Sequence, residues 1–207
     1  MKNVRRKISL VCFVCASLCV FAFLSSCKKN GQVETSDLLN FSDDTTAAAQ
    51  LVADANEDLN KIKVLYKQNE DKREELVAAM KGSDAEKVKK IADDLVYIIN
   101  DGMALGESAI GKIERAQEMN INPDFNEYLR LKSESLRKQM DAFENYRQAA
   151  RFLRDGYNPK DDRQRETVKA EFTKRDENFQ KTMEVARDYS KQANELAKES
   201  AKKNGQK

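Results

Sequence analysis

The chain has 207 residues, of which 35% are charged, and it contains four cysteines, two prolines and no histidine or tryptophan. The absence of histidine excludes a Ser-His-Asp triad, histidine-ligated zinc or haem, and an imidazole pH switch. Two prolines and seven glycines are too few to separate the many short strands of a β-sandwich. The composition therefore favours long helices.

The start of the chain has the features of a secretory leader. An uncharged, mostly apolar run from Ile8 to Leu24 is shorter than the roughly 20 residues that a spanning helix needs. Four basic residues and no acidic residue precede it, as in a signal peptide: Lys2, Arg5, Arg6 and Lys7. At its end, Leu24-Ser25-Ser26-Cys27 resembles the lipobox of bacterial lipoproteins, in which a large apolar residue and two small residues precede a cysteine.

The lipobox resemblance implies that the leader, residues 1–26, is removed and that Cys27 becomes the first residue. Its thiol would carry diacylglycerol and its amino group a further acyl chain such as palmitate, and two or three chains hold a protein stably on a membrane. We therefore expect a lipid-anchored protein of the bacterial cell envelope, on the outer membrane or cell surface rather than the inner membrane. The alternative is an uncleaved signal anchor in which Cys27 is unmodified.

Removal of the leader changes the charge and the cysteine content. The 37 basic residues of the chain lose the four in the leader while all 35 acidic residues remain, so the formal charge changes from +2 to −2. A near-neutral charge with both signs interspersed argues against a nucleic-acid partner. Three cysteines leave with the leader and Cys27 is used for lipid, so the mature protein is expected to have no disulfide and no cysteine-ligated metal.

The mature chain divides into a tether, a helical region and a tail. Residues 27–42 are polar with a few isolated apolar side chains, and we interpret them as the lipidated cysteine and a flexible tether. Apolar residues recur at helical spacings across residues 43–203, and residues 204–207 form a frayed tail. Turn signals at Gly82, at Pro123, and at Gly156 with Pro159 divide the helical region into four segments of similar length.

Capping signals support the limits of the four expected helices. The first should end at Lys81, with Gly82 at the position after the helix. Ser83-Asp-Ala-Glu86 reads as a capping box for the second helix. Asn122 and Pro123 fit the start of the third, and the fourth should begin at Asn158–Pro159 or Asp161–Asp162.

Four such helices with short connections predict an all-α fold, an elongated antiparallel four-helix bundle with up-down-up-down order and coiled-coil-like packing. This topology places the turns near Gly82 and Gly156 at the end distant from the lipid, and the turn near Pro123 at the other end. A three-helix bundle that forms a homodimer and a bundle with a mobile fourth helix are alternative interpretations.

Two sets of residues are unusual within the predicted helices. Three glycines interrupt the second helix, which indicates close approach of a neighbouring helix or, as an alternative, space for an apolar ligand: Gly102, Gly106 and Gly111. Three polar residues fall at similar depth on inward-facing stripes: Asn69, Gln139 and Arg175. They could form one buried polar layer, but we favour the interpretation that their long side chains reach outward to solvent.

The best candidate for a contact surface lies near the end of the third helix. Arg147, Arg151 and Arg154 are spaced by four and three residues and therefore share a helix face, with Phe152 and Tyr157 close by. Arginine and tyrosine are enriched at the energetic centres of protein interfaces. The alternative is a solvated helix end held by salt bridges.

No catalytic, nucleotide-binding, metal-binding or cofactor motif occurs in the sequence, and we expect a non-enzymatic protein without a cofactor. The leading hypothesis is a lipid-anchored helical module that binds or scaffolds an unidentified protein partner. The second is a structural spacer of the envelope, because the chain ends in Lys207 as the small murein lipoproteins end in a lysine that is joined to peptidoglycan. A carrier of an apolar ligand is the third.

Overall fold

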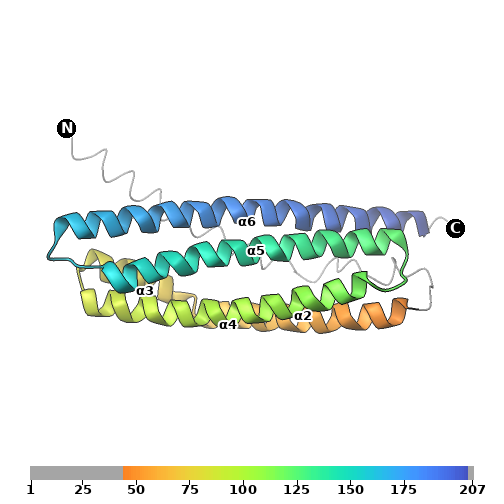
Figure 1. Cartoon of the computed structure of the whole chain (residues 1–207), viewed down its shortest axis with the longest axis horizontal. Coiled ribbons are helices and arrows are strands. Elements are labelled where there is room, and N and C mark those ends of the chain that lie inside the picture. Colours follow the sequence, from red (N-terminus) through yellow and green to blue (C-terminus); the bar gives the residue numbers. More distant parts are fainter. Residues whose placement is uncertain (1–43, 205–207) are drawn as a thin grey trace. The chain divides into compact units, whose positions relative to one another are not determined.

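The computed structural model describes residues 44–204, which form five helices (Figure 1). These are α2 (Thr45–Gln68), α3 (Asp71–Lys81), α4 (Ala85–Gln117), α5 (Pro123–Gly156) and α6 (Asp162–Asn204). The leader, the lipobox, Cys27 and the tether lie outside the described residues. None of the helices in residues 44–204 has a stretch apolar and long enough to cross a membrane.

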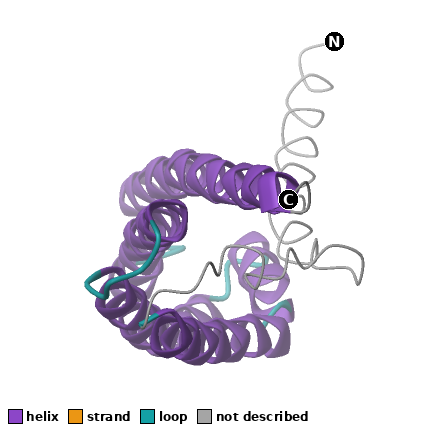
Figure 2. Cartoon of the chain, turned by 90° about the vertical axis from the view of Figure 1, so that its right-hand side faces the viewer, coloured by secondary structure: helices purple, strands orange, loops and turns teal. Residues whose placement is uncertain are grey.

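The helical unit is an antiparallel bundle, as the sequence predicts. The most extensive helix contacts join α5 to α6, α4 to α5 and α2 to α4, while α3 packs mainly on α4. Figure 1 shows α6, α5 and α4 in that order with α2 alongside α4, and Figure 2 shows the same helices along the bundle. A helix of 34 residues such as α5 is about 50 Å long.

The contact between α5 and α6 combines a buried hydrogen bond with aromatic packing. The hydroxyl of Ser135 donates a hydrogen bond of 2.7 Å to the carbonyl oxygen of Ala186, which fixes the antiparallel register. Further along the same contact, the ring of Phe179 on α6 packs against the rings of Phe143 and Tyr146 on α5, with 6.3 and 5.5 Å between the ring centres.

Two of the predicted helix starts are confirmed. The side chain of Asn122 accepts a hydrogen bond of 2.8 Å from the backbone N–H of Phe125, with Pro123 as the first residue of α5. At α6 the side chain of Asp161 accepts a hydrogen bond of 3.0 Å from the N–H of Gln164. Both caps satisfy backbone donors that have no partner inside the helix.

The predicted turn between the first two helices is displaced by one residue. Gly82 has an ordinary φ of −75°, and Ser83 has the left-handed φ of 56°. The N–H of Ser83 donates to the carbonyl of Met80 (3.3 Å) and that of Asp84 to the carbonyl of Ala79 (3.0 Å), the two bonds of a Schellman motif. Asp84 therefore caps α4 by accepting from Lys87, and the capping box starting at Ser83 is wrong.

The first predicted helix is broken in the structure at Asn69–Glu70, between α2 and α3. The N–H of Asn69 donates to Tyr66 at 3.1 Å, three residues back, and its side-chain amide donates to the carbonyl of Leu65 at 2.8 Å. The amide side chain thus takes over a helical hydrogen bond that the backbone no longer makes. No glycine or proline marks this break in the sequence.

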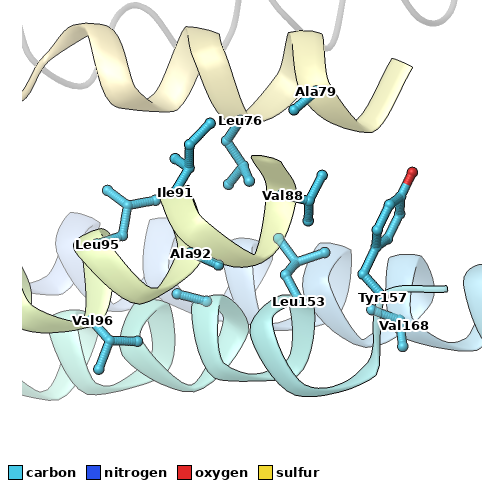
Figure 3. Packing of buried hydrophobic residues seen from close by; sticks show 11 residues of the cluster. Leu76, Ala79, Val88, Ile91, Ala92, Leu95, Val96, Leu153, Tyr157 and Val168 are labelled. Carbon is cyan, nitrogen blue, oxygen red and sulfur yellow. The ribbon is translucent and has the colours of Figure 1, made fainter. Parts of the chain in front are cut away.

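An apolar cluster lies where α3, α4, α5 and α6 meet (Figure 3). Leu76 of α3, Val88 of α4 and Leu153 of α5 are almost completely buried in it. At full burial, each such side chain contributes about 1.5–3 kcal/mol to stability. The cluster holds the α3–α4 turn and the α5–α6 loop together at one end of the bundle.

At the opposite end, the start of α2 meets the α4–α5 loop, and the end of α6 meets the start of α5. The backbone N–H of Asn120 donates to a carboxylate oxygen of Asp44 (2.9 Å), and Ser200 donates to a carboxylate oxygen of Asp124 (3.0 Å). The chain therefore enters α2 and reaches the end of α6 at the same end of the helical unit.

Two of the three glycines in α4 are explained by close packing. A side chain at Gly102 would press against the ring of Tyr66, and one at Gly106 would collide with Met140. Nothing lies within 4 Å of the corresponding position at Gly111. The space beside Gly102 and Gly106 is thus filled by neighbouring side chains, which removes the sequence argument for an apolar ligand there.

The three inward-facing polar residues do not form one layer. Asn69 bonds to the carbonyl of Leu65, and Gln139 donates to Ser135 at 3.3 Å. Arg175 donates to the side chain of Gln148. Each side chain has a separate partner, and that of Arg175 lies on α5, so the three residues do not meet in one shared polar layer.

Candidate functional site

The candidate surface begins with two polar contacts between α4 and α5. Arg154 forms an ion pair with Asp93, with 3.2 Å between Nη1 and Oδ1, and Arg147 donates a hydrogen bond of 2.8 Å to Asn100. The α4 partners are seven residues apart, as are the two arginines, so the contacts lie two helical turns apart in an antiparallel register. They mark one edge where α4 and α5 meet.

Tyr97 lies on this edge, between the two contacts. It follows Asp93 by four residues and precedes Asn100 by three, which places all three on one face of α4. Arg151 is placed in the same way between Arg147 and Arg154 on α5. The Tyr97 side chain is 65% exposed, the largest exposed fraction among the exposed large apolar and aromatic residues of the described chain. We name this the α4/α5 outer face: Asp93, Tyr97, Asn100, Arg147, Arg151 and Arg154.

Ion pairs hold two arginines of the α4/α5 outer face in place, Arg147 and Arg154. Arg154 donates both to Asp93 and, through two nitrogens at 2.7 and 3.1 Å, to the carboxylate of Asp155. The hydrogen bonds from Arg154 lower the pKa of Asp155, because they favour its charged form. Arg147 is also paired with Glu144. Exposed pairs add little stability, but they restrict the positions of the guanidinium groups before a partner arrives.

Phe152 belongs to a different side of α5 from the three arginines. The guanidinium carbon of Arg175 on α6 lies 4.8 Å from the centre of the Phe152 ring, while Arg175 also bonds to Gln148. Phe152 is 39% exposed. Phe152 is therefore a partly covered residue at the junction of α5 and α6, and it borders the α4/α5 outer face rather than forming its centre.

Tyr157 does not belong to the surface predicted from the sequence. Its side chain belongs to the apolar cluster (Figure 3). Its hydroxyl donates a hydrogen bond of 3.0 Å to the carbonyl oxygen of Met80. The residue directly follows α5, so the chain turns inward there and carries the ring into the core. Tyr157 links the α5–α6 loop to the end of α3.

Helical spacing in the sequence separates Tyr97 from its apolar neighbours. The apolar stripe of α4 passes through Ile91, Leu95 and Ile99, and Tyr97 lies on the opposite side of the helix. Leu95-Val-Tyr-Ile-Ile99 is the most apolar stretch of the helical region, which draws attention away from the position of Tyr97 on the helix. A helical projection of the segment would have separated the exposed aromatic ring from the buried residues.

A second charged group is buried between α2 and α4. Asp58 is only 4% exposed and accepts hydrogen bonds from Lys112 (2.6 Å) and Ser108 (2.8 Å), with Lys61 at 3.4 Å. The bond from Lys112 is the main reason that the pKa of Asp58 is lowered, and it outweighs the opposing effect of burial. Because its acceptors are occupied by neighbouring side chains, we interpret this cluster as a link between helices.

A third charged group joins α3 to α6. Nη2 of Arg73 lies 3.7 Å from Oδ1 of Asp176, and the Arg73 guanidinium lies 5.0 Å from the centre of the Tyr146 ring. Burial raises the pKa of Asp176, and the charge of Arg73 only partly offsets this effect. The pair is therefore a weak contact in surroundings that disfavour the carboxylate charge.

The geometry of residues 44–204 offers little for metal or ligand chemistry. Within this part of the chain no three carboxylate, histidine or cysteine side chains gather as a metal site would require. An open depression between α3 and α4 is lined mostly by charged residues, including Lys72, Glu75, Lys87 and Asp94. Such a lining does not suit an apolar ligand.

Comparisons with protein families, with curated proteins and with solved structures find no match to this chain. The arguments on function therefore rest on the residues of the chain and on their arrangement.

Proposed function

We propose that this protein is a bacterial lipoprotein whose helical bundle displays a protein-binding surface from the membrane, without enzymatic activity. The lipobox Leu24-Ser25-Ser26-Cys27 and the basic, then apolar, leader support the anchor. The surface is the α4/α5 outer face. The observation that carries this assignment is the exposed ring of Tyr97 beside arginines whose positions are already restricted by ion pairs.

The position of this face in the bundle favours contact with a partner. Residues 28–43 would connect Cys27 to α2 at the end where Asp44 bonds to Asn120. Tyr97 is nearer to the α3–α4 turn than to the α4–α5 loop, so it lies in the half of the bundle away from that end. A protein arriving from outside would meet it without first reaching the lipid surface.

The chemistry of the face suits a protein partner better than the alternatives. An aromatic ring and several arginines provide both contact area and directed hydrogen bonds, which is the composition of interface centres. Acidic residues between the arginines, such as Asp93 and Glu144, oppose the uniformly positive surface that a nucleic acid needs. We place the protein on the outer membrane or the cell surface.

The anchor is tested by labelling with radioactive palmitate in cells that express the natural chain or Cys27→Ala. Label that depends on Cys27 supports the anchor, and label-free natural protein contradicts it. Protease treatment of intact cells in the same experiment distinguishes a surface-exposed body, which is cut, from one enclosed in the envelope, which is protected.

The binding surface is tested by capture of envelope or host proteins on the natural chain and on Tyr97→Ala with Arg151→Glu. A matched control is Lys181→Glu, which changes an exposed charge on α6. We expect a specific partner to be lost with the double variant and kept with the control. A partner that binds all three chains equally would contradict the assignment to the α4/α5 outer face.

A further inference from the structure

α3 is separated from both of its neighbours along the chain. At its start, the last hydrogen bonds of α2 are completed by Asn69 itself, through its N–H to Tyr66 and its side chain to Leu65. At its end, α4 has its own cap at Asp84. The terminal backbone groups of α2 and α4 therefore have hydrogen-bond partners outside α3. Both helices would stay intact at these ends if α3 moved away.

α3 covers an apolar surface to which the other helices contribute. Leu76 and Ala79 point from α3 towards Val88 and Ile91 of α4, as Figure 3 shows, and Leu153 of α5 lies beneath them. The same cluster includes Val168 of α6. Since α4 packs on α5 and α5 packs on α6, the three helices stay together without α3 and would present these residues as an apolar groove.

Besides the hydrogen bond of 3.0 Å that the carbonyl oxygen of Met80 accepts from the Tyr157 hydroxyl, two ion pairs join α3 to its neighbours. Lys72 pairs with Asp94 at 2.7 Å, and Arg73 lies 3.7 Å from Asp176 and over the ring of Tyr146. Both ion pairs are partly exposed, and such pairs contribute little. Among the described helices α3 is the shortest, with 11 residues, and it packs mainly on α4. Short elements with few buried contacts are the ones that open locally while the rest of a protein stays folded.

We propose that α3 opens as a unit about Asn69–Glu70 and the turn at residues 82–84, and that the groove it leaves binds an amphipathic helix of a partner protein. This surface is distinct from the α4/α5 outer face and is covered when the partner is absent. Binding of an amphipathic helix in an apolar groove is a common mode of protein recognition.

α3 itself indicates the chemistry of the partner helix. Its buried residues Leu76 and Ala79 are three apart, and a basic residue stands three positions before the first of them, at Arg73. The carboxylates of Asp94 and Asp176 flank the groove and would pair with basic residues near the start of the incoming helix. A partner with apolar residues at the same spacing and a basic first turn would replace the contacts of α3.

Opening is measured by thiol labelling, because the natural chain has no cysteine after Cys27. Ala79→Cys and Ala142→Cys are matched full-length variants, each with one buried alanine replaced, the first on α3 and the second between α5 and α6. Peptide mass spectrometry after reaction with a maleimide separates the new thiol from those of the leader. We expect Cys at position 79 to react at least about tenfold faster, as local opening predicts. Equal rates would overturn the proposal.

A second variant tests whether the contacts of α3 control the opening. Arg73→Ala removes the contacts to Asp176 and Tyr146 but leaves the buried apolar residues. In this background, labelling at position 79 should rise by about fivefold while labelling at position 142 stays constant. An equal rise at both positions would show general destabilisation and would overturn the assignment of a separate opening unit.

The groove is tested with a fluorescent peptide of residues 69–83 as the probe, added to the full-length chain. We expect saturable binding that becomes about fivefold tighter when the chain carries Arg73→Ala, because the resident α3 competes less well. A control peptide with Leu76→Asp should not bind. Absence of saturable binding, or equal binding of the two peptides, would overturn the groove as a binding site.

Discussion

The side chain of Met140 on α5 occupies the space that Gly106 on α4 leaves open, and a methyl group at Gly106 would overlap the Met140 sulfur. Gly111, five residues further along the same helix, has no neighbour within 4 Å of the equivalent position. Two glycines of one helix therefore have different roles: the first permits a close approach of α4 and α5, and the second does not.

We predict opposite effects of the same substitution at these two glycines. Gly111→Ala should raise the free energy of unfolding by about 0.5–1 kcal/mol, because alanine is the better helix former and has room. Gly106→Ala should lower it by about 1–2 kcal/mol, because Met140 is buried and must shift. Urea unfolding followed by circular dichroism measures both. Stabilisation by Gly106→Ala would show that Met140 moves aside without cost.

The turn between α3 and α4 gives a second prediction. Ser83→Gly should stabilise the protein by about 1 kcal/mol, because Ser83 has a φ of 56°, which glycine adopts more easily. Gly82→Ala is the control, and it should be nearly neutral because φ at Gly82 is −75° and the new methyl group would lie at an ordinary distance of 3.5 Å from the carbonyl oxygen of Ala78. If Gly82 were the left-handed residue, the control would instead be clearly destabilising.

The raised pKa of Asp176, the partner of Arg73, predicts that the stability of the protein depends on pH. Burial raises the pKa of Asp176 in the folded protein above its value of 3.8 in an unfolded chain. The folded state therefore binds this proton more tightly, and the contribution of Asp176 to stability is present at low pH and is lost as pH rises through the raised pKa. As pH falls from 7 to 4, the free energy of unfolding of the natural chain should therefore increase relative to that of Asp176→Asn.

Denaturant unfolding of both chains at several pH values measures this difference. A relative stability that stays constant, or that falls on acidification, would contradict the prediction. The contrast with Asp58 provides an internal control, because its pKa is shifted in the opposite direction.

For Asp58, stability is expected to depend on pH in the opposite direction. Hydrogen bonds from Lys112 and Ser108 lower its pKa, so its contribution is present above pH 3.8 and is lost as pH falls through the lowered pKa. At neutral pH, Asp58→Ala should cost about 2–3 kcal/mol, because it removes the carboxylate that accepts from Lys112 and Ser108 and leaves Lys112 only the carbonyl oxygen of Asp54 at 3.3 Å. The cost should diminish in acid. A cost below about 0.5 kcal/mol at pH 7 would show that water replaces the carboxylate.

Periodicity and capping residues were sufficient to predict the bundle. The start of α5 at Asn122 and Pro123 follows from side-chain chemistry that acts within a few residues, and such local signals are visible in the sequence. The break at Asn69 was not predicted, because it contains no glycine or proline. It occurs where the Tyr66 ring stacks on Phe143 of α5 at 5.1 Å, a contact that depends on the packing of separate helices.

The candidate site was predicted in part. The shared face of Arg147, Arg151 and Arg154 follows from helical spacing, and the structure places two of these arginines in contacts with α4. Tyr157 was misplaced because its position depends on the direction in which the chain leaves α5. Tyr97 was missed because its neighbours along the sequence are apolar, although its neighbours on the helix surface are not.

The start of α2 and the end of α6 lie at the same end of the bundle. This arrangement has a consequence for any role as a spacer between two layers of the envelope. A lipid on Cys27 and a covalent link through Lys207 would both attach to the bundle at the end where Asp44 meets Asn120. The height of the bundle would then add nothing to the separation of the two layers. That separation would depend on the residues that connect Cys27 to α2 and Lys207 to α6, and the helices would lie beside the link instead of forming part of it.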